Sequence, residues 1–140
     1  MKVVKLEQII IEEKTLQESK EKTVSLETSE SENLKNIIVS ALEDAKGNEI
    51  SVINVIHLTQ MTDYMVIASG TSNRHIQTLA EAAIKKAQEN NFEKIGLEGL
   101  GQSEWVVVDF SDVVLHVMSP AAREHYNIEG LWDIKTKSER

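Results

Sequence analysis

The sequence contains no cysteine. This absence excludes disulfide cross-links, thiolate metal sites and cysteine nucleophiles, and it fits a reducing compartment better than a secreted one. We therefore expect a cytoplasmic protein. A chain of 140 residues needs no cross-link to fold, because it can bury roughly two thirds of its unfolded surface in one domain.

Long apolar runs are missing as well. The apolar stretches are far shorter than the ~20 residues that a membrane-spanning helix needs. The N-terminal residues have neither the apolar core of a signal peptide nor the arginine-rich, acid-poor composition of a transit peptide. The sequence therefore predicts no membrane segment.

Positive charge is scarce: 15 basic side chains face 23 acidic ones, which gives a formal net charge of -8. The field of such a molecule repels phosphate backbones, so direct nucleic-acid binding is disfavoured. A basic protein partner, such as a ribosomal protein, would instead be attracted.

The signatures of common catalytic sites are also absent. The four histidines, His57, His75, His116 and His125, do not have zinc-ligand spacing, and neither HExxH nor GxSxG occurs. Asp109 and Asp112 are the candidate carboxylates for a two-metal site, but they flank a predicted turn, where aspartate is an ordinary turn former. We expect no catalytic residue, no metal and no cofactor.

Residues 1–32 differ in composition from the rest. They hold five lysines and eight glutamates and no aromatic residue, glycine or proline. Such a segment buries too little surface to offset its ordering entropy. We interpret it as an acidic N-terminal extension, either disordered or a loosely docked helix. We place the folded domain at residues 33–134 and a C-terminal tail at 135–140.

Apolar spacing within the domain predicts alternating helices and strands. Helical spacing starts near residue 34, after Ser31 or Asn33 as cap, and ends at Lys46-Gly47. A second helix covers residues 76–87 and a third begins at Pro120. β-Branched runs predict strands at residues 50–58, 64–69 and 95–98, followed by a hairpin over 104–118. The order indicates an α/β (α+β) fold with a single mixed sheet of about five strands flanked by helices.

The stretch GTSNRH, residues 70–75, joins the second strand to the second helix. A glycine at a helix start offers free backbone N–H groups to an anion, with Thr71, Ser72 and Arg74 as the candidate ligands. Thr71, Ser72 or Asn73 can satisfy the same groups as an N-cap. Because the full dinucleotide and triphosphate fingerprints are absent, we favour plain capping.

The predicted hairpin has two unlike faces. Alternation places Val106, Val108 and Phe110 on one side and Trp105, Val107 and Asp109 on the other. A two-residue turn near Ser111 then adds His116 and Met118 to the second face. Trp, His, Met and Asp together are typical of a contact surface, with Trp105 as anchor and Glu98 and Glu104 as an acidic rim. The alternative is that the third helix covers this face and Trp105 belongs to the core.

Three stretches, TDYMVIASGTSNRHIQTLAE, GLEGLGQSEWVVVDFSDVVLHVM and AREHYNIEGLW, together resemble the ribosomal silencing factor family, also called the Iojap family. The match runs from about Asn33 to Trp132. It implies a fold similar to that of the nucleotidyltransferases, without their catalytic carboxylate pair.

The resemblance also implies a function. Members of this family bind the large ribosomal subunit through ribosomal protein number fourteen, block joining of the two subunits and dampen translation when nutrients are short. Carried over to this sequence, the expected contact residues are Trp105, Glu104, Glu98, Asp109, His116 and Met118, with Tyr64 and Asp63 as weaker candidates. The rival hypothesis is a nucleotide-binding or residual nucleotidyltransferase enzyme that uses the GTSNRH loop. The sequence leaves open a homodimer of the free protein.

Overall fold

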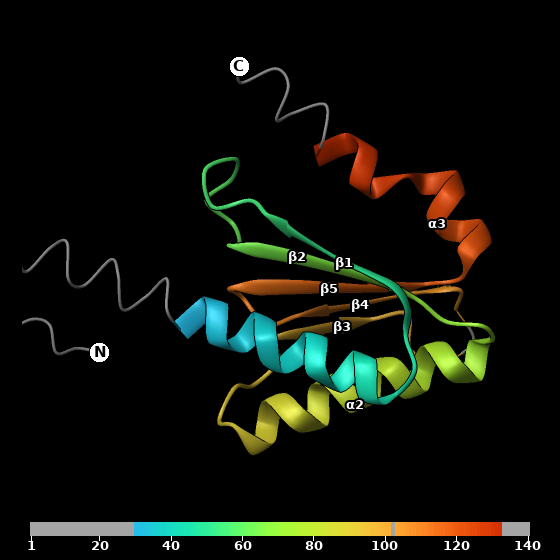
Figure 1. Ribbon diagram of the computed structural model, residues 1–140, viewed down its shortest axis with the longest axis horizontal. Helices are drawn as coiled ribbons and strands as arrows, with labels where there is room; N and C mark the ends of the chain where they lie inside the picture. Colours follow the sequence, from blue (N-terminus) through green and yellow to red (C-terminus); the bar gives the residue numbers. More distant parts are fainter. Residues whose placement is uncertain (1–29, 102, 133–140) are drawn as a thin grey trace, which may run out of the picture.

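The computed structural model describes residues 30–101 and 103–132 and consists of one sheet between two layers of helices (Figure 1). A helix over residues 30–44 is followed by the strands β1 (Asn48–Asn54) and β2 (Tyr64–Ser69). The helix α2 (Asn73–Glu89) leads to β3 (Gly96–Glu98), β4 (Trp105–Asp109) and β5 (Val113–Met118). The helix α3 (Pro120–Tyr126) and a last turn of helix over residues 128–132 complete the described part.

The strands form one five-stranded sheet in the order β1-β2-β5-β4-β3. β2 and β5 are parallel, and the other neighbouring pairs are antiparallel. The predicted fold class, a single mixed sheet with flanking helices, is confirmed. β1 and β3 are the two edges of the sheet.

One face of the sheet holds the main core. The helix over residues 30–44 and α2 both lie on this face (Figure 1). They bury a continuous aliphatic layer against the strands, which includes Leu34, Ile38, Ile76, Leu79, Val66, Val108 and Leu115. Full burial of each such side chain stabilises the fold by roughly 1.5–3 kcal/mol, so this layer contributes most of the apolar stabilisation.

α3 packs on the opposite face, which we call the α3 face (Figure 1). The cluster there is smaller: Met65, Ile67, Met118 and Ala122 are buried, and Ile53, Trp105, Ile128 and Trp132 pack partly buried around them. Ala122 is the only residue of α3 that is buried. The α3 layer is therefore the thinner of the two helical layers.

The hairpin has the predicted register. Phe110 N–H donates to Val113 O at 2.9 Å, so Ser111 and Asp112 form a two-residue turn, and Ser111 adopts a left-handed φ of 79°. Trp105 is opposite Met118 and Val107 is opposite His116. The predicted division of the hairpin into two faces is confirmed.

Two predicted boundaries are wrong. The first strand ends at Asn54 instead of Leu58, because Asn54 Oδ1 accepts Ile56 N–H at 3.0 Å and turns the chain. The first helix already includes residue 30, so Ser31 and Asn33 lie inside it and do not cap it; Ser31 is fully buried. Most of the predicted extension (1–32) and the predicted tail (135–140) lie outside the described residues.

Candidate functional site: a hollow beside α3

Trp105, the predicted anchor, occupies the first position of β4 on the α3 face. Ser103 Oγ holds its backbone on both sides: it accepts Trp105 N–H at 3.0 Å and donates to Trp105 O at 2.8 Å. The indole Nε1–H donates to His116 Nδ1 at 2.9 Å. The tryptophan side chain is half-buried, so one part of the ring belongs to the core and the rest stays accessible.

His116 is buried beneath the indole. Burial penalises the charged imidazolium and lowers the pKa of His116 to about 4. The ring is therefore neutral near pH 7. Because its Nδ1 accepts from Trp105, the proton of the neutral ring sits on Nε2. His116 acts as a fixed acceptor that orients the indole.

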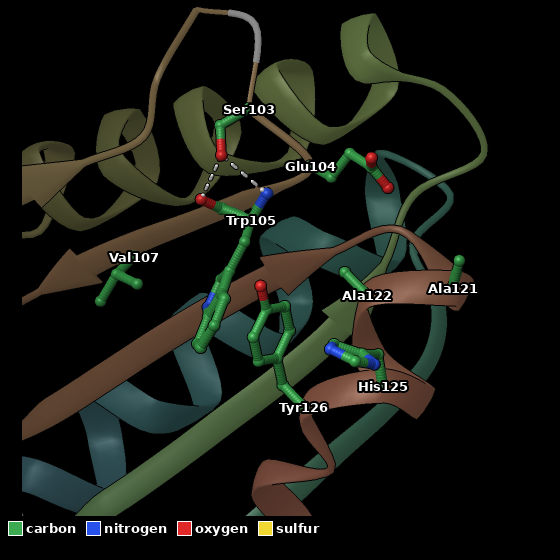
Figure 2. Close-up of a pocket in the computed structure, with 8 residues that line it drawn as sticks. All are labelled: Ser103, Glu104, Trp105, Val107, Ala121, Ala122, His125 and Tyr126. Carbon is green, nitrogen blue, oxygen red and sulfur yellow. Dashed lines mark hydrogen bonds between the residues drawn. The ribbon is translucent and has the colours of Figure 1, made fainter.

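A hollow of about 680 Å³ opens between the start of β4 and α3. Figure 2 shows the Trp105 indole and the Tyr126 ring side by side in it, with Glu104 near the start of β4 and Ala121 and Ala122 on α3. The two ring centroids are 4.7 Å apart, with the planes tilted by 42°. We call this space the aromatic hollow; its lining residues are Ser103, Glu104, Trp105, Val107, Ala121, Ala122, His125 and Tyr126.

Glu104 is held in place at the hollow. Ser119 Oγ donates to Glu104 Oε1 at 2.7 Å, and the Ser119 backbone N–H donates to Glu104 O at 2.9 Å. Ser119 is also the N-cap of α3, where its Oγ accepts Ala122 N–H. One serine thus ties the start of α3 to the start of β4 and orients a carboxylate that remains exposed.

α3 covers only part of the α3 face. It packs over β2 and β5, whereas the side toward β3 carries half-buried Val107, Val114 and Asp109 and exposed Glu98. Glu98 is paired with Val107 and therefore points to the same face as Trp105. We call this region the open half of the α3 face. The sequence left open whether this face is an exposed contact surface or is covered by the third helix. The structure shows a part of each: α3 covers one half of the face, and Trp105 lies at the border of the covered half.

The predicted contact residues do not form one patch. Met118 is fully buried under Ala122, so the prediction of a direct contact by Met118 needs correction; the side chain supports the surface from below. His116 is also buried, and its role is to orient Trp105. Trp105, Glu104 and Glu98 remain as accessible side chains of one region.

The other predicted residues lie toward the opposite end of the strands. Tyr64 starts β2 and is buried on the main-core face, with Lys35 Nζ 5.4 Å from its ring centroid. Burial, together with the nearby carboxylates of Glu32 and Asp63, raises the pKa of Tyr64. Asp109 Oδ1 accepts Ser111 N–H at 2.7 Å and so stabilises the hairpin turn. Burial of Tyr64 separates it from any partner on the α3 face.

The GTSNRH loop is a capped helix start. Ser72 is the N-cap of α2, and its Oγ accepts His75 N–H at 3.0 Å. The Thr71 backbone N–H donates to His75 Nδ1 at 2.9 Å, and His75 Nε2 lies 3.0 Å from Ala45 O. The loop's own side chains thus use amides that an anion would need, and the predicted capping of the helix by Ser72 is confirmed. Thr71, Ser72 and Arg74 are exposed.

Position 70 requires a glycine because the backbone there lies close to Ile76. A Cβ at this position would lie 2.8 Å from Ile76 Cγ1 and 3.0 Å from Ile76 N. The glycine therefore allows the loop to pack closely on the first turn of α2, as the capping arrangement requires.

Sequence patterns alone missed Tyr126 and His125, which line the hollow. The available signal is helical spacing: Ala121 and Ala122 lie four residues before His125 and Tyr126, so all four share one side of α3. The sequence could not show that this side faces Trp105, because that depends on how α3 crosses the sheet.

Charge is distributed unevenly over the molecule. Residues 30–132 carry seven basic and fifteen acidic side chains, which accounts for the whole net charge of -8. Four of the seven basic residues lie on the helix over residues 30–44 or on α2, and two more lie in the loops that follow these helices: Lys35, Arg74, Lys85 and Lys86, then Lys46 and Lys94. The seventh, Arg123, is largely buried and paired with Glu129 at 2.8 Å. The side of the molecule that carries α3 has an acidic surface in the described part of the chain, and we call it the α3 side. Its exposed carboxylates are Glu49, Glu98, Glu104 and Glu124.

Comparison with known proteins agrees with this architecture. The family model described as "Ribosomal silencing factor during starvation" matches residues 28–140. The chain is 41% identical to "Ribosomal silencing factor RsfS" of Chromobacterium violaceum over 74% of this chain and 84% of the relative. A crystal structure of a protein from the same bacterium superposes with a TM-score of 0.72 at 40% identity, covering 73% of this chain and 85% of that chain.

A mouse relative, "Mitochondrial assembly of ribosomal large subunit protein 1", is 36% identical over 72% of this chain and 46% of its own length. The fold and these matches define a class of ribosome-associated proteins. The chain belongs to the ribosomal silencing factor family, so the resemblance inferred from its motifs is confirmed. No helix within residues 30–101 and 103–132 is long and apolar enough to cross a membrane.

Proposed function

We propose that this protein represses translation by binding the large ribosomal subunit through ribosomal protein number fourteen and sterically blocking the small subunit from joining. The observation that carries the proposal is the acidic α3 side, with half-buried Trp105 at the border of its open half, in a chain of the ribosomal silencing factor family. Ribosomal proteins are basic as a class, so opposite charges favour this encounter. The proposed setting is the cytoplasm under nutrient limitation.

No chemical step is needed for this function. A bound protein of 140 residues at the surface where two subunits meet excludes the second subunit by volume alone. The described residues support such a role because the exposed part of Trp105 offers an aromatic anchor and Glu104 lines the same hollow. Exposed Glu98, paired with Val107, adds a second carboxylate on the same face of the sheet.

The experiment is co-sedimentation of the full chain with purified large subunits, followed by addition of small subunits. Glu98→Lys is the informative variant, since Glu98 is exposed at an edge strand and its replacement leaves the core intact. We expect binding to weaken at least tenfold and subunit joining to recover. The matched control is Glu81→Lys, the same charge change on the exposed side of α2, which should bind like the native chain.

Two results would overturn the proposal. Native chain that fails to sediment with large subunits would exclude the function. Equal binding by the two variants would exclude the α3 side as the contact surface.

A further inference from the structure

The aromatic hollow is built for more than general charge attraction. Its two rings, Trp105 and Tyr126, lie 4.7 Å apart at a tilt of 42°. Tyr126 is 56% exposed although it is a large aromatic residue. Exposed aromatic faces beside a carboxylate form the arrangement that attracts a cation through ring quadrupole and charge together.

We propose that the aromatic hollow receives one arginine side chain of the ribosomal partner, stacked on Tyr126 and Trp105 and paired with Glu104. This inference rests on the proposed function and adds the chemical identity of the group that the site recognises. A planar guanidinium can stack on a ring and donate to a carboxylate at the same time, whereas an ammonium group offers only a point charge.

The walls of the hollow are fixed before any partner binds. His116 Nδ1 holds the indole at 2.9 Å, Ser103 Oγ brackets the Trp105 backbone, and Ser119 Oγ holds Glu104 Oε1 at 2.7 Å. The other carboxylate oxygen of this side chain, Glu104 Oε2, accepts no hydrogen bond within the described part of the chain. This oxygen is thus oriented and available to accept from a guanidinium N–H. Binding to such a preorganised site loses less conformational entropy than binding to mobile side chains.

The surroundings favour a cation of a protein over other ligands. About 680 Å³ is enough for an arginine side chain with its neighbouring backbone. The surrounding surface is acidic, and Arg123, the only lysine or arginine on α3, is paired with Glu129 on the other side of the helix. The other basic residue of this helix is His125, which lines the hollow. A nucleic acid would meet repulsion here, so the observations favour a basic protein segment.

The test uses the full chain, ¹⁵N-labelled, and two five-residue peptides: Gly-Gly-Arg-Gly-Gly and the same peptide with citrulline, which has nearly the shape of arginine but no charge. The readout is the indole N–H resonance of Trp105, distinguished from that of Trp132 by a Trp132→Phe sample. We expect the arginine peptide to shift this resonance in a saturable way and the citrulline peptide to bind at least fivefold more weakly. Equal shifts with both peptides would overturn the proposal.

Variants of Tyr126 distinguish stacking of the guanidinium on an aromatic ring from simple apolar contact. Tyr126→Phe keeps the ring face and should bind the arginine peptide like the native chain, whereas Tyr126→Leu should bind it about five- to tenfold more weakly. Glu104→Gln should also weaken binding, and Glu81→Gln serves as control. If Tyr126→Leu binds as tightly as the native chain, the aromatic hollow is not the arginine site.

The same variants distinguish this inference from the proposed function. If Glu98→Lys abolishes sedimentation with large subunits while Tyr126→Leu leaves both sedimentation and peptide binding unchanged, the proposed function stands and the arginine site is wrong. If the native chain does not sediment with large subunits but its Trp105 resonance still discriminates arginine from citrulline, the proposed function fails and a cation site of the stated chemistry remains.

Discussion

At the scale of single residues, the hydrogen bond between Trp105 and His116 fixes the side chain that we propose as the anchor of the contact surface. The indole needs a hydrogen-bond acceptor because part of it is buried, and the imidazole supplies one only while it is neutral. Burial ensures this by lowering the pKa of His116 to about 4. The sequence predicts His116 as a contact residue. In the structure it is buried and orients the indole of Trp105, the proposed contact residue.

The lowered pKa of His116 makes stability depend on pH. In the unfolded chain the histidine titrates near its ordinary value of 6.5, while in the folded chain it stays neutral down to about 4. The stabilising contribution of neutral, buried His116 to the unfolding free energy is fully present above pH 6.5. It is lost as pH falls from 6.5 to about 4, by up to about 1.4 kcal/mol per pH unit. We expect the difference in unfolding free energy between the native chain and His116→Gln to shrink from pH 7 to pH 5 in urea titrations.

Gln at position 116 can still accept from the indole, so this comparison isolates the titration. His57→Gln makes the same substitution at an exposed position and serves as the reference for the change of residue type. A native-to-His116→Gln difference that stays constant between pH 7 and pH 5 would contradict the assignment.

At the scale of elements, α3 is held to the sheet by a network of polar contacts as well as by the packing of Ala122. Arg123 donates from Nε to Glu129 Oε1 at 3.0 Å and from Nη2 to Glu129 Oε2 at 2.8 Å. Its Nη1 donates to Ser69 Oγ at 2.9 Å, and Ser51 Oγ donates to Glu129 Oε2 at 2.7 Å. These contacts join α3, β2, β1 and the last helical turn. The bond from Arg123 is the main cause of the lowered pKa of Glu129.

Arg123→Met should therefore destabilise the fold by about 1–3 kcal/mol, because the substitution leaves Glu129 without its cation and Ser69 without its donor. Lys86→Met is the matched control: the Lys86–Asp44 pair is longer, at 3.5 Å, and more exposed, and Lys86 Nζ makes one further hydrogen bond, to Ser40 Oγ at 2.8 Å. Its loss should therefore cost less, about 1 kcal/mol. Urea unfolding of both variants measures the two effects. Similar losses would show that the Arg123 network has no special role.

The elements themselves were largely predictable from the sequence, and their contacts were not. Period-two alternation in EWVVVDF and DVVLHVM was enough to assign the two faces of the hairpin, since each residue's side follows from local geometry. The pattern predicts that the first strand continues to residue 58, because Val55 is apolar. In the structure Val55 is buried, but it lies in a turn, so the strand ends before it. The aromatic hollow was missed because it depends on where α3 crosses the sheet, which is a long-range packing outcome.

At the scale of the whole molecule, the separation of charge is the main feature. Among the described residues, the lysines and arginines other than Arg123 lie on the helices of the main-core layer or in the loops that follow them, and the α3 side carries carboxylates without an unpaired lysine or arginine. Such a distribution orients a protein in the field of a cationic partner before contact. The position of a charge should then matter as much as its sign.

We expect Glu124→Lys, on the exposed side of α3, to slow association with large subunits several-fold at low salt, and Glu81→Lys on α2 to have little effect although the net charge changes equally. The difference should disappear near 0.5 M salt, where screening shortens the reach of the field. Stopped-flow light scattering measures both rates. Equal slowing by the two variants would indicate that only net charge matters.

The shared serine at the start of α3 has a mechanical consequence. Ser119 caps this helix and, through its hydroxyl and amide, also fastens Glu104 at the head of β4. The first turn of the helix bearing Tyr126 and the carboxylate of Glu104 therefore share one support. Loss of the Ser119 hydroxyl would remove the cap of one wall of the hollow and the hydrogen bond of the other at the same time.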